Sequence, residues 1–363
     1  MIKVAVVGLG KMGLSHLAMI RAHPDVEVVA VVDSAGYLLD VLSKYTGLQT
    51  FGDLRDAIKA VHLDAIIIAT PTRLHAPMVR VALENGIDVF CEKPLTLSAS
   101  ESLELTDLAS ERGLVTQVGY HNRFVGAFQE VKRLLDAGAI GRVTHVQAEA
   151  YGPVVLKPKG STWRSQRAEG GGCLYDYAAH PLDLLSWYFG APRGLGGTVL
   201  GNVFSENTED EVFGTLFYDT GLTGQISVNW SDESYRKMTT MITITGTAGR
   251  IHADRQEVQV YLRDTAPAVE GYETGWNVKY TTELTSPVWF YLRGEEYSAQ
   301  LDYFVQRVQS RQEEGLNSFA SAAVTDRVLE LLTIDAARGP STTDDAAALP
   351  AVPRRRRLLR RRS

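Results

Sequence analysis

The chain has 363 residues, of which 45% are hydrophobic and 22% are charged, and its formal net charge is −6 at pH 7. This length suits two domains of an ordinary globular protein. The composition excludes a disulfide framework, because only Cys91 and Cys173 occur, and a membrane span, because no apolar run approaches roughly 20 residues. The acidic balance argues against general nucleic-acid affinity.

The chain starts with an apolar strand at residues 3–7 that runs directly into a glycine turn, a pattern that predicts no signal peptide. Together with the scarcity of cysteine, this indicates a cytoplasmic protein. The turn reads Gly8-x-Gly10-x-x-Gly13 and is followed by the periodicity of a helix. The glycines permit a tight turn and close approach of a pyrophosphate, and the helix N-terminus offers amide hydrogens to phosphate. The motif alone is a weak signal, but its place between strand and helix predicts a dinucleotide-binding domain.

A second apolar strand, at residues 27–32, ends in Asp33, 20 residues after Gly13. An acid at this spacing accepts hydrogen bonds from the adenosine ribose hydroxyls. Its carboxylate would repel a 2′-phosphate, and residues 34–38 contain no Arg or Lys to pair with one. We therefore predict NAD rather than NADP. A simple turn aspartate would explain Asp33 alone but not the whole pattern.

Helices and strands continue to alternate up to about residue 118, and this alternation predicts a parallel, doubly wound α/β sheet. We expect further helices at 38–45, 54–61, from His75 to about 85, and at 99–112. We expect further strands near 50–51, at 64–69 before Thr70-Pro71, at 88–91 and at 114–118.

The strand at 88–91 stops abruptly at Glu92, Lys93 and Pro94. Open α/β sheets bind ligands beyond the carboxyl ends of their strands, so this strand would present Lys93 to a ligand. Pro94 fixes its own φ and bends the chain directly after the lysine. Taken alone, the pattern also fits a strand end with two solvated charges.

The pattern changes after Gly119, where short alternating strands dominate. They predict a mostly antiparallel sheet with one face covered and the other available for a second subunit. Expected strands are 143–151, 198–202, 212–218, 222–230, 238–246, 249–253 and 256–262, with helices at 127–137, 297–310 and 319–336. We accordingly predict an N-terminal Rossmann domain at 1–121, a C-terminal α+β domain at 122–337 and a disordered tail at 338–363.

A glycine run at residues 170–172 interrupts these strands and precedes a helix. Asp176 and His180 lie four residues apart and therefore share one face of that helix. Pro181 predicts a kink or the start of a second helical segment. The pair could also be a surface contact or half of a metal site.

A metal site would need further ligands at a matching spacing. His75 and His121 are the candidates, but neither completes a recognisable ligand set. We therefore predict no metal.

These motifs occur in a specific order, although each is modest by itself. They are Gly8-x-Gly10-x-x-Gly13, Ala69-Thr70-Pro71 with His75, Glu92-Lys93-Pro94, Gly119 with Arg123-Phe124, Trp163-Arg164 and Gly171-Gly172-x-x-x-Asp176-x-x-x-His180. Over roughly residues 1–337 the chain closely resembles the Gfo/Idh/MocA family of dehydrogenases, named after glucose–fructose oxidoreductase, inositol dehydrogenase and a rhizopine-catabolism protein. Ala178 departs from the family pattern, because many members have glycine there.

The resemblance implies a Rossmann domain, a second domain whose open sheet forms dimers or tetramers, and NAD(P)-linked hydride transfer. The implied substrate is a secondary alcohol of a sugar, a sugar derivative or a cyclitol such as inositol. Lys93, Asp176 and His180 match the catalytic residues of the family. The positions that line the dinucleotide are matched by Gly8, Gly10, Lys11, Met12, Asp33, Thr70, Pro71, His75, Glu92 and Lys93. Substrate contacts are implied for His121, Trp163, Arg164, Asp176 and His180.

Two other functions remain open from the sequence. An NAD-dependent glycoside hydrolase would oxidise its sugar only transiently. A non-catalytic, dinucleotide-sensing regulator would keep the fold but would have no use for Lys93, Asp176 and His180.

Two basic segments carry separate hypotheses. The loop at residues 153–167 is either solvated or a clamp for an anionic substrate such as a phosphorylated or nucleotide-activated sugar, since arginine pairs with phosphate bidentately. Its basic residues are Lys157, Lys159, Arg164 and Arg167. The tail at 354–363 holds seven arginines and is either an appendage or an arm that binds polyanions. No function is based on it.

Overall fold

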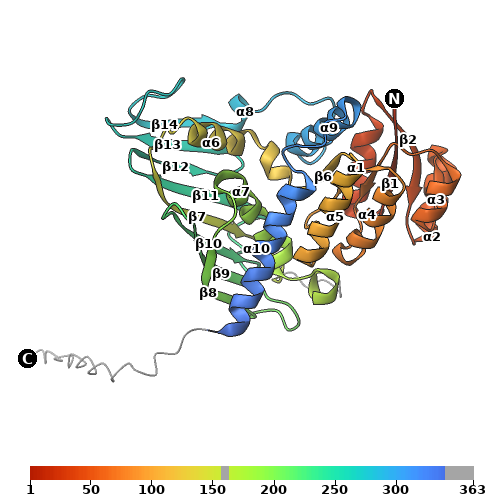
Figure 1. Cartoon of the computed structure of the whole chain (residues 1–363), viewed down its shortest axis with the longest axis horizontal. Coiled ribbons are helices and arrows are strands. Elements are labelled where there is room, and N and C mark those ends of the chain that lie inside the picture. Colours follow the sequence, from red (N-terminus) through yellow and green to blue (C-terminus); the bar gives the residue numbers. More distant parts are fainter. Residues whose placement is uncertain (157–162, 340–363) are drawn as a thin grey trace, which may run out of the picture.

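The computed structural model of the chain describes residues 1–156 and 163–339. Lys157, Lys159 and the arginine-rich tail lie outside the described residues. The described residues form two sheets of six and eight strands, which lie on opposite sides of a layer of helices (Figure 1). No helix in the described ranges is long and apolar enough to cross a membrane.

The first sheet is wholly parallel, with the order β3-β2-β1-β4-β5-β6, which confirms the predicted doubly wound fold. Its strands are β1 (Ile2–Val7), β2 (Val26–Val32), β3 (Gln49–Phe51), β4 (Ala65–Ile68), β5 (Asp88–Cys91) and β6 (Thr116–Val118). Its helices are α1 (Lys11–Arg21), α2 (Gly36–Thr46), α3 (Leu54–Ala60), α4 (His75–Glu84) and α5 (Ala99–Glu111). All residues of β4 and β5 are buried, as expected for central strands covered by helices on both faces.

The second sheet has the order β14-β13-β12-β11-β7-β10-β9-β8, and only β7 and β10 pair in parallel. Its strands are β7 (Val143–Tyr151), β8 (Gly194–Gly201), β9 (Glu211–Phe217), β10 (Thr223–Asn229), β11 (Thr239–Gly246), β12 (Gly249–Ala253), β13 (Glu257–Leu262) and β14 (Gly275–Tyr280). The prediction of a mostly antiparallel sheet is thus confirmed, although β14 and the short helix α8 (Thr281–Leu284) were not expected. In β14 the apolar side chains are the exposed ones, so its pattern does not indicate a core strand.

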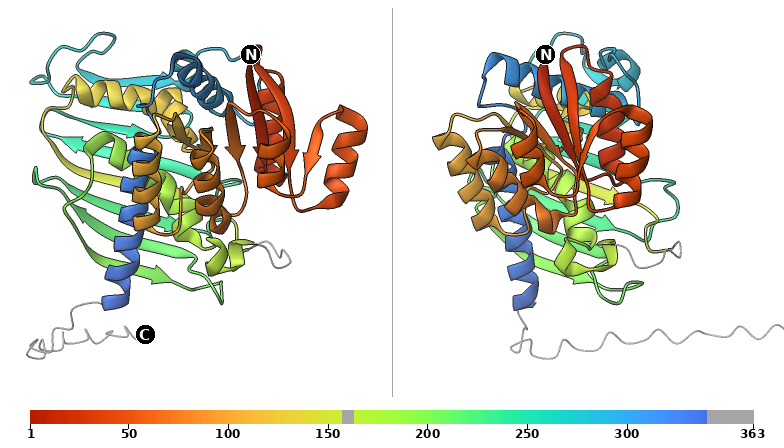
Figure 2. Two further views of the ribbon diagram at one scale, coloured as in Figure 1. Left: turned by 45° about the vertical axis from the view of Figure 1, so that its right-hand side comes forward. Right: turned by 90° about the vertical axis from the view of Figure 1, so that its right-hand side faces the viewer.

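Helices cover one face of the second sheet and leave the other face open (Figure 2). The covering helices are α6 (Gly126–Asp136), α7 (Ala179–Phe189) and α10 (Phe319–Arg338). Burial alternates along β9, where Val212 and Leu216 are buried while Phe213 and Phe217 face the open side. The sheet is therefore half-buried, as its alternating sequence predicts.

The second half of the chain also contributes to the first sheet. Helix α9 (Glu295–Ser310) packs on it through Leu301, Phe304 and Val305, and the Phe304 ring lies 5.9 Å from that of Phe90. The predicted boundary between residues 121 and 122 stays a prediction. It falls within the 3₁₀ helix η2 (His121–Phe124), which follows β6 directly.

A buried ion pair holds η2 against the second domain. Arg123 Nε donates to Asp183 Oδ2 at 2.8 Å, and its Nη2 donates to Oδ1 at 2.6 Å. The Nη1 group of Arg123 donates to the Leu316 carbonyl at 2.5 Å. One guanidinium thus joins η2, α7 and the segment before α10 with bidentate geometry. Burial nevertheless outweighs Arg123 and raises the pKa of the Asp183 carboxyl.

We expect Arg123→Met to lower the free energy of unfolding by about 3–5 kcal/mol, because it leaves the buried carboxylate of Asp183 without its partner. Urea denaturation measures the change. The control Arg80→Met breaks the exposed pair with Glu104 and should cost less than about 1 kcal/mol. Equal effects of the two substitutions would contradict the role given to Arg123.

Candidate active site

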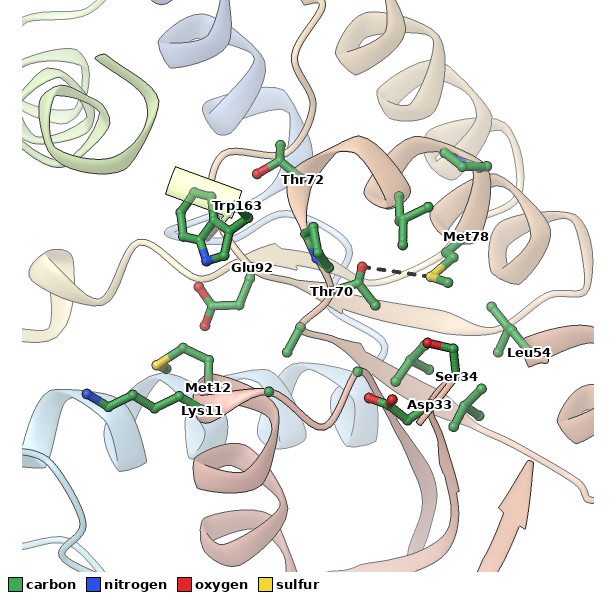
Figure 3. A pocket seen from close by; sticks show the side chains of 18 of the residues that line it. Lys11, Met12, Asp33, Ser34, Leu54, Thr70, Thr72, Met78, Glu92 and Trp163 are labelled. Atoms are coloured by element: carbon green, nitrogen blue, oxygen red, sulfur yellow. Dashed lines mark hydrogen bonds between the residues drawn. The ribbon is translucent and has the colours of Figure 1, made fainter. Parts of the chain in front are cut away.

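A cavity of about 620 Å³ lies at the carboxyl edge of the first sheet. Its walls include Val7, Val32, Ala69 and Glu92, each at or just beyond the end of a strand. Figure 3 shows Asp33, Ser34 and Leu54 at one end, and Lys11, Met12, Glu92 and Trp163 toward the other. A ligand crevice was predicted at this edge.

The glycine turn shapes the floor of the cavity as a dinucleotide requires. A Cβ atom on Gly13 would lie 1.7 Å from the Gly8 carbonyl oxygen, so this position tolerates no side chain. Gly8 has φ +88° and would meet Ala69 at 2.8 Å. Nothing lies within 4 Å of a Cβ on Gly10, which caps α1 and lines the cavity. The space beside Gly10 and the helix N-terminus therefore fits a pyrophosphate.

Asp33 marks the other end of the cavity. Its Oδ2 accepts a hydrogen bond from the Leu9 amide at 2.5 Å, and its Oδ1 accepts one from the Ala35 amide at 2.8 Å. These bonds fix the carboxylate beside the glycine turn, where a ribose would be bound. Arg55, at the start of α3, lines the same end, although no local pattern in residues 34–38 predicted a nearby cation.

Thr70 and Pro71 line the cavity, whereas His75 is buried behind it. The Nδ1 atom of His75 lies 2.9 Å from the Pro94 carbonyl and its Nε2 lies 3.0 Å from that of Thr70. The imidazole thus joins the loops after β4 and β5, and burial lowers its pKa. Its predicted contact with the dinucleotide stays a prediction.

Lys93 and Asp176 come from different halves of the chain and meet at the cavity wall. The Nζ atom of Lys93 donates to the Asp176 carbonyl at 2.7 Å and to Oδ1 at 3.3 Å. Arg164 Nε donates to Oδ2 at 2.8 Å. Burial opposes ionisation of Asp176, but the two cations outweigh it and hold the pKa of its carboxyl below the usual value. The peptide bond between Lys93 and Pro94 is cis.

The local backbone explains how Asp176 reaches this position. A Cβ on Gly171 would lie 2.4 Å from the Arg164 carbonyl, and one on Gly172 would lie 2.1 Å from Glu209 Oε1. The glycine run therefore permits the close passage that the sequence predicts. Asp176 then lies on a π-helical turn (Leu174–Ala178), and α7 begins at Ala179. Such turns recur at functional sites, and the second helical segment predicted from Pro181 is present.

His180 is 4% exposed and lies in the first turn of α7. Its ring meets that of His121 edge-on at 4.9 Å, and its Nδ1 is buried without a hydrogen-bond partner among the described residues. Burial, followed by the charges of Lys93 and Arg255, lowers its pKa well below the usual value. The carboxylate of Asp176 contacts Lys93 and Arg164, whereas the ring of His180 contacts that of His121. The two residues of the expected Asp176–His180 pair therefore have different partners.

Several residues near the site carried no sequence signal. Tyr297 stacks on His121 at 4.5 Å, and the Arg293 guanidinium lies 5.2 Å above the Tyr297 ring. Arg293 also lines the cavity, as does Trp163, which the sequence did predict and whose ring lies 4.8 Å from the Arg164 guanidinium. Arg293 and Tyr297 lie more than 100 residues after Asp176 in the chain, so only tertiary folding brings them here. No group of three or more potential ligands in the described part of the chain could hold a metal ion.

The two halves of the chain match two models of one protein family. Residues 2–120 match "Oxidoreductase family, NAD-binding Rossmann fold", and residues 128–252 match "GFO/IDH/MocA C-terminal domain". The chain belongs to the GFO/IDH/MocA family of oxidoreductases. Its first domain is an NAD-binding Rossmann domain, which confirms the cofactor predicted from the glycine turn and Asp33. The cavity described above fits that group.

Similar proteins include enzymes that act on polyols and sugars. Scyllo-inositol 2-dehydrogenase (NAD(+)) of Bacillus subtilis (strain 168) is 29% identical over 235 residues, which are 63% of this chain and 67% of that protein. The structure of GenD2 from gentamicin A biosynthesis in complex with NAD is 26% identical, with a TM-score of 0.76 over 93% of this chain and 95% of that one. Levoglucosan dehydrogenase in complex with NADH shares the fold at 21% identity, with a TM-score of 0.81 over 93% and 98% of the two chains.

Burial lowers the pKa of both His121 and His180. At mildly acidic pH the unfolded chain therefore binds protons at these two residues, whereas the folded chain does not. The free energy of unfolding should therefore fall as the pH drops below about 6.5, by about 1 kcal/mol per histidine for each pH unit. Urea denaturation between pH 7 and 5.5 measures this slope.

The double variant His121→Gln/His180→Gln should lose this part of the slope. The control His62→Gln should keep it, because the side chain of His62 is 75% exposed and not buried. Parallel curves for the double variant and the unsubstituted chain would contradict the burial of neutral imidazoles.

Proposed function

We propose that this oxidoreductase transfers a hydride between NAD and the secondary alcohol or ketone of a sugar, a sugar derivative or a cyclitol such as inositol. One observation carries the proposal: Lys93 from the first domain contacts Asp176 from the second at one end of the NAD cavity. His180 is close enough for the charge of Lys93 to affect its pKa. The names of the inositol and levoglucosan dehydrogenases support a polyhydroxylated ring as substrate.

Oxidation of an alcohol releases a proton from the hydroxyl as the hydride leaves the carbon. The nicotinamide supplies the hydride chemistry when it is bound. His180 is our proposed base, because its lowered pKa keeps the imidazole neutral and able to accept a proton at neutral pH. In the reverse direction the imidazole of His180 returns the proton to the carbonyl oxygen.

Lys93 is the proposed donor to the substrate oxygen. Its side chain is 13% exposed and lines the cavity, where the ammonium would stabilise the charge that develops on an alkoxide. Asp176 orients this ammonium through its carbonyl and its carboxylate, and Arg164 supports the carboxylate from the other side. His121 and Trp163 are proposed to contact the substrate around this centre.

The basic residues of the loop at residues 153–167 bear on whether the enzyme prefers a neutral or an anionic substrate. Arg164 is already engaged by Asp176, and Arg167 is exposed. A sugar that carries phosphate or a nucleotide would extend toward these arginines. The substrate screen described below therefore compares neutral and anionic compounds.

We also propose that the enzyme forms a homodimer or homotetramer through the open face of its second sheet. Large apolar side chains are exposed on this sheet in two groups, one on β9 and one on β13 and β14, and exposed apolar patches mark interfaces. They are Phe213, Phe217, Tyr261, Trp276, Val278 and Tyr280.

The two cysteines are both free and buried, which supports a reducing compartment such as the cytoplasm.

Trp276→Glu should weaken this association by about tenfold or more, because Trp276 is 65% exposed and a carboxylate there would be buried in the interface. Analytical ultracentrifugation over a concentration series measures the shift. Tyr45→Glu, on α2 of the first domain, removes an equally exposed aromatic ring and should leave the mass unchanged. A monomeric unsubstituted chain would contradict the proposal.

A screen that follows NADH formation with inositols, free sugars, sugar phosphates and nucleotide sugars tests the activity directly. On the substrate so found, His180→Ala should lower kcat by about 10²–10⁴, because the proton then has no positioned acceptor. NAD affinity should not change, since His180 does not line the NAD cavity. Turnover close to that of the unsubstituted enzyme would remove His180 from the mechanism.

A further inference from the structure

Glu92 places a carboxylate in the cavity wall directly before Lys93. Figure 3 shows its side chain between Met12 and Trp163, at the end away from Asp33. Its Oε1 lies 2.6 Å from His16 Nε2, and its Oε2 accepts a hydrogen bond from the Lys93 amide at 3.3 Å. The carboxylate is therefore fixed from both sides at the end of the cavity where we place the reaction.

The partner of Glu92 is the imidazole of His16. His16 is fully buried in α1, and its Nδ1 has no hydrogen-bond partner among the described residues. The 2.6 Å contact with His16 Nε2 therefore anchors the Glu92 carboxylate to a side chain that is itself packed in the first domain.

The ammonium of the next residue, Lys93, is engaged by Asp176. Lys93 Nζ contacts the carbonyl and the carboxylate of Asp176. Burial opposes ionisation of Glu92, but His16 and Lys93 outweigh it and hold the pKa of its carboxyl below the usual value. Gly119 leaves room for this group, since a Cβ there would lie 2.9 Å from Glu92 Oε2. The result is an ionised carboxylate fixed in the wall of the cofactor cavity, which Lys93, Arg164 and Arg293 also line.

We propose that Glu92 makes the site discriminate between the two redox states of its cofactor, binding NAD⁺ in preference to NADH. The inference rests on the proposed function, which puts the reactive end of the cofactor beside Lys93. NAD⁺ and NADH differ in charge only at the nicotinamide ring, which is cationic in the oxidised state and neutral in the reduced state. A fixed carboxylate near the ring therefore lowers the free energy of the oxidised complex selectively.

This preference acts on binding and release rather than on the chemical step. Oxidation of the substrate would transfer a hydride, that is one proton with two electrons, from the carbon to the ring. The hydroxyl proton would go to the base. The ring then carries no charge for Glu92 to attract, so the reduced cofactor leaves more readily. Tight binding of NAD⁺ and ready release of NADH are the properties of an enzyme that operates in the direction of oxidation.

The test compares the dissociation constants of NAD⁺ and NADH for the full chain and for Glu92→Gln. Glutamine keeps an oxygen that can accept from His16 but carries no charge. The ratio Kd(NADH)/Kd(NAD⁺) should fall by about tenfold, chiefly through weaker binding of NAD⁺. A tenfold change corresponds to about 30 mV in the potential of the bound two-electron couple. Isothermal titration calorimetry measures both constants without any substrate.

Glu104→Gln on α5 is the matched control, because it removes an exposed carboxylate that does not line the cavity, and it should leave the ratio unchanged. A second variant, Glu92→Asp, retains the charge and should keep most of the preference. An equal loss of affinity for both cofactors in Glu92→Gln would overturn the inference and leave the proposed function intact. A shifted ratio without activity on any compound of the screen would support the role of Glu92 and contradict the proposed substrate class.

Discussion

The contact of Lys93 with Asp176 joins the two domains at the cavity, and the proposed function depends on it. Lys93 follows strand β5 of the first domain, and Asp176 lies on the π-helical turn before α7 of the second. Two hydrogen bonds from one ammonium close the distance between them, and Arg164 completes the carboxylate shell. The ammonium of Lys93 is thus oriented by a buried carboxylate and not by a mobile ion from the solvent. It can therefore act on a substrate oxygen from a fixed position.

The frame around this contact is built to keep it in place. The buried pair of Arg123 and Asp183 joins η2 to α7, the helix that also carries His180. Helix α10 packs against both α5 of the first domain and α7 of the second, and α9 returns to the first sheet. The two domains thus share helices as well as a cavity. This packing joins the segments that carry Lys93 and His180, the two residues to which the proposed mechanism gives roles.

Burial assigns different charge states to neighbouring groups of the site. The carboxyls of Glu92 and Asp176 remain ionised because each has close donors, whereas His121 and His180 are held neutral because they have few. The same desolvation therefore yields fixed anions and an imidazole free to accept a proton. Glu92 contacts His16, whereas Asp176 contacts Lys93 and Arg164, so the two acids have different partners although they line one cavity.

The sequence by itself determined the elements and most of the residues at the strand ends. Gly8, Gly10 and Gly13 can be placed from local rules, because a tight turn between a strand and a helix is a short-range requirement. The period of the apolar residues predicted both sheets for the same reason. It failed at β14, where Trp276 and Tyr280 face solvent and the alternation is inverted. Only the tertiary structure decided which charges meet: that Asp176 lies with Lys93 rather than with His180, that His16 holds Glu92, and that Arg293 and Tyr297 border the site. These contacts join residues 76 to 176 positions apart, and their energies depend on burial and on the distance between partners. No local pattern in the chain carries either quantity.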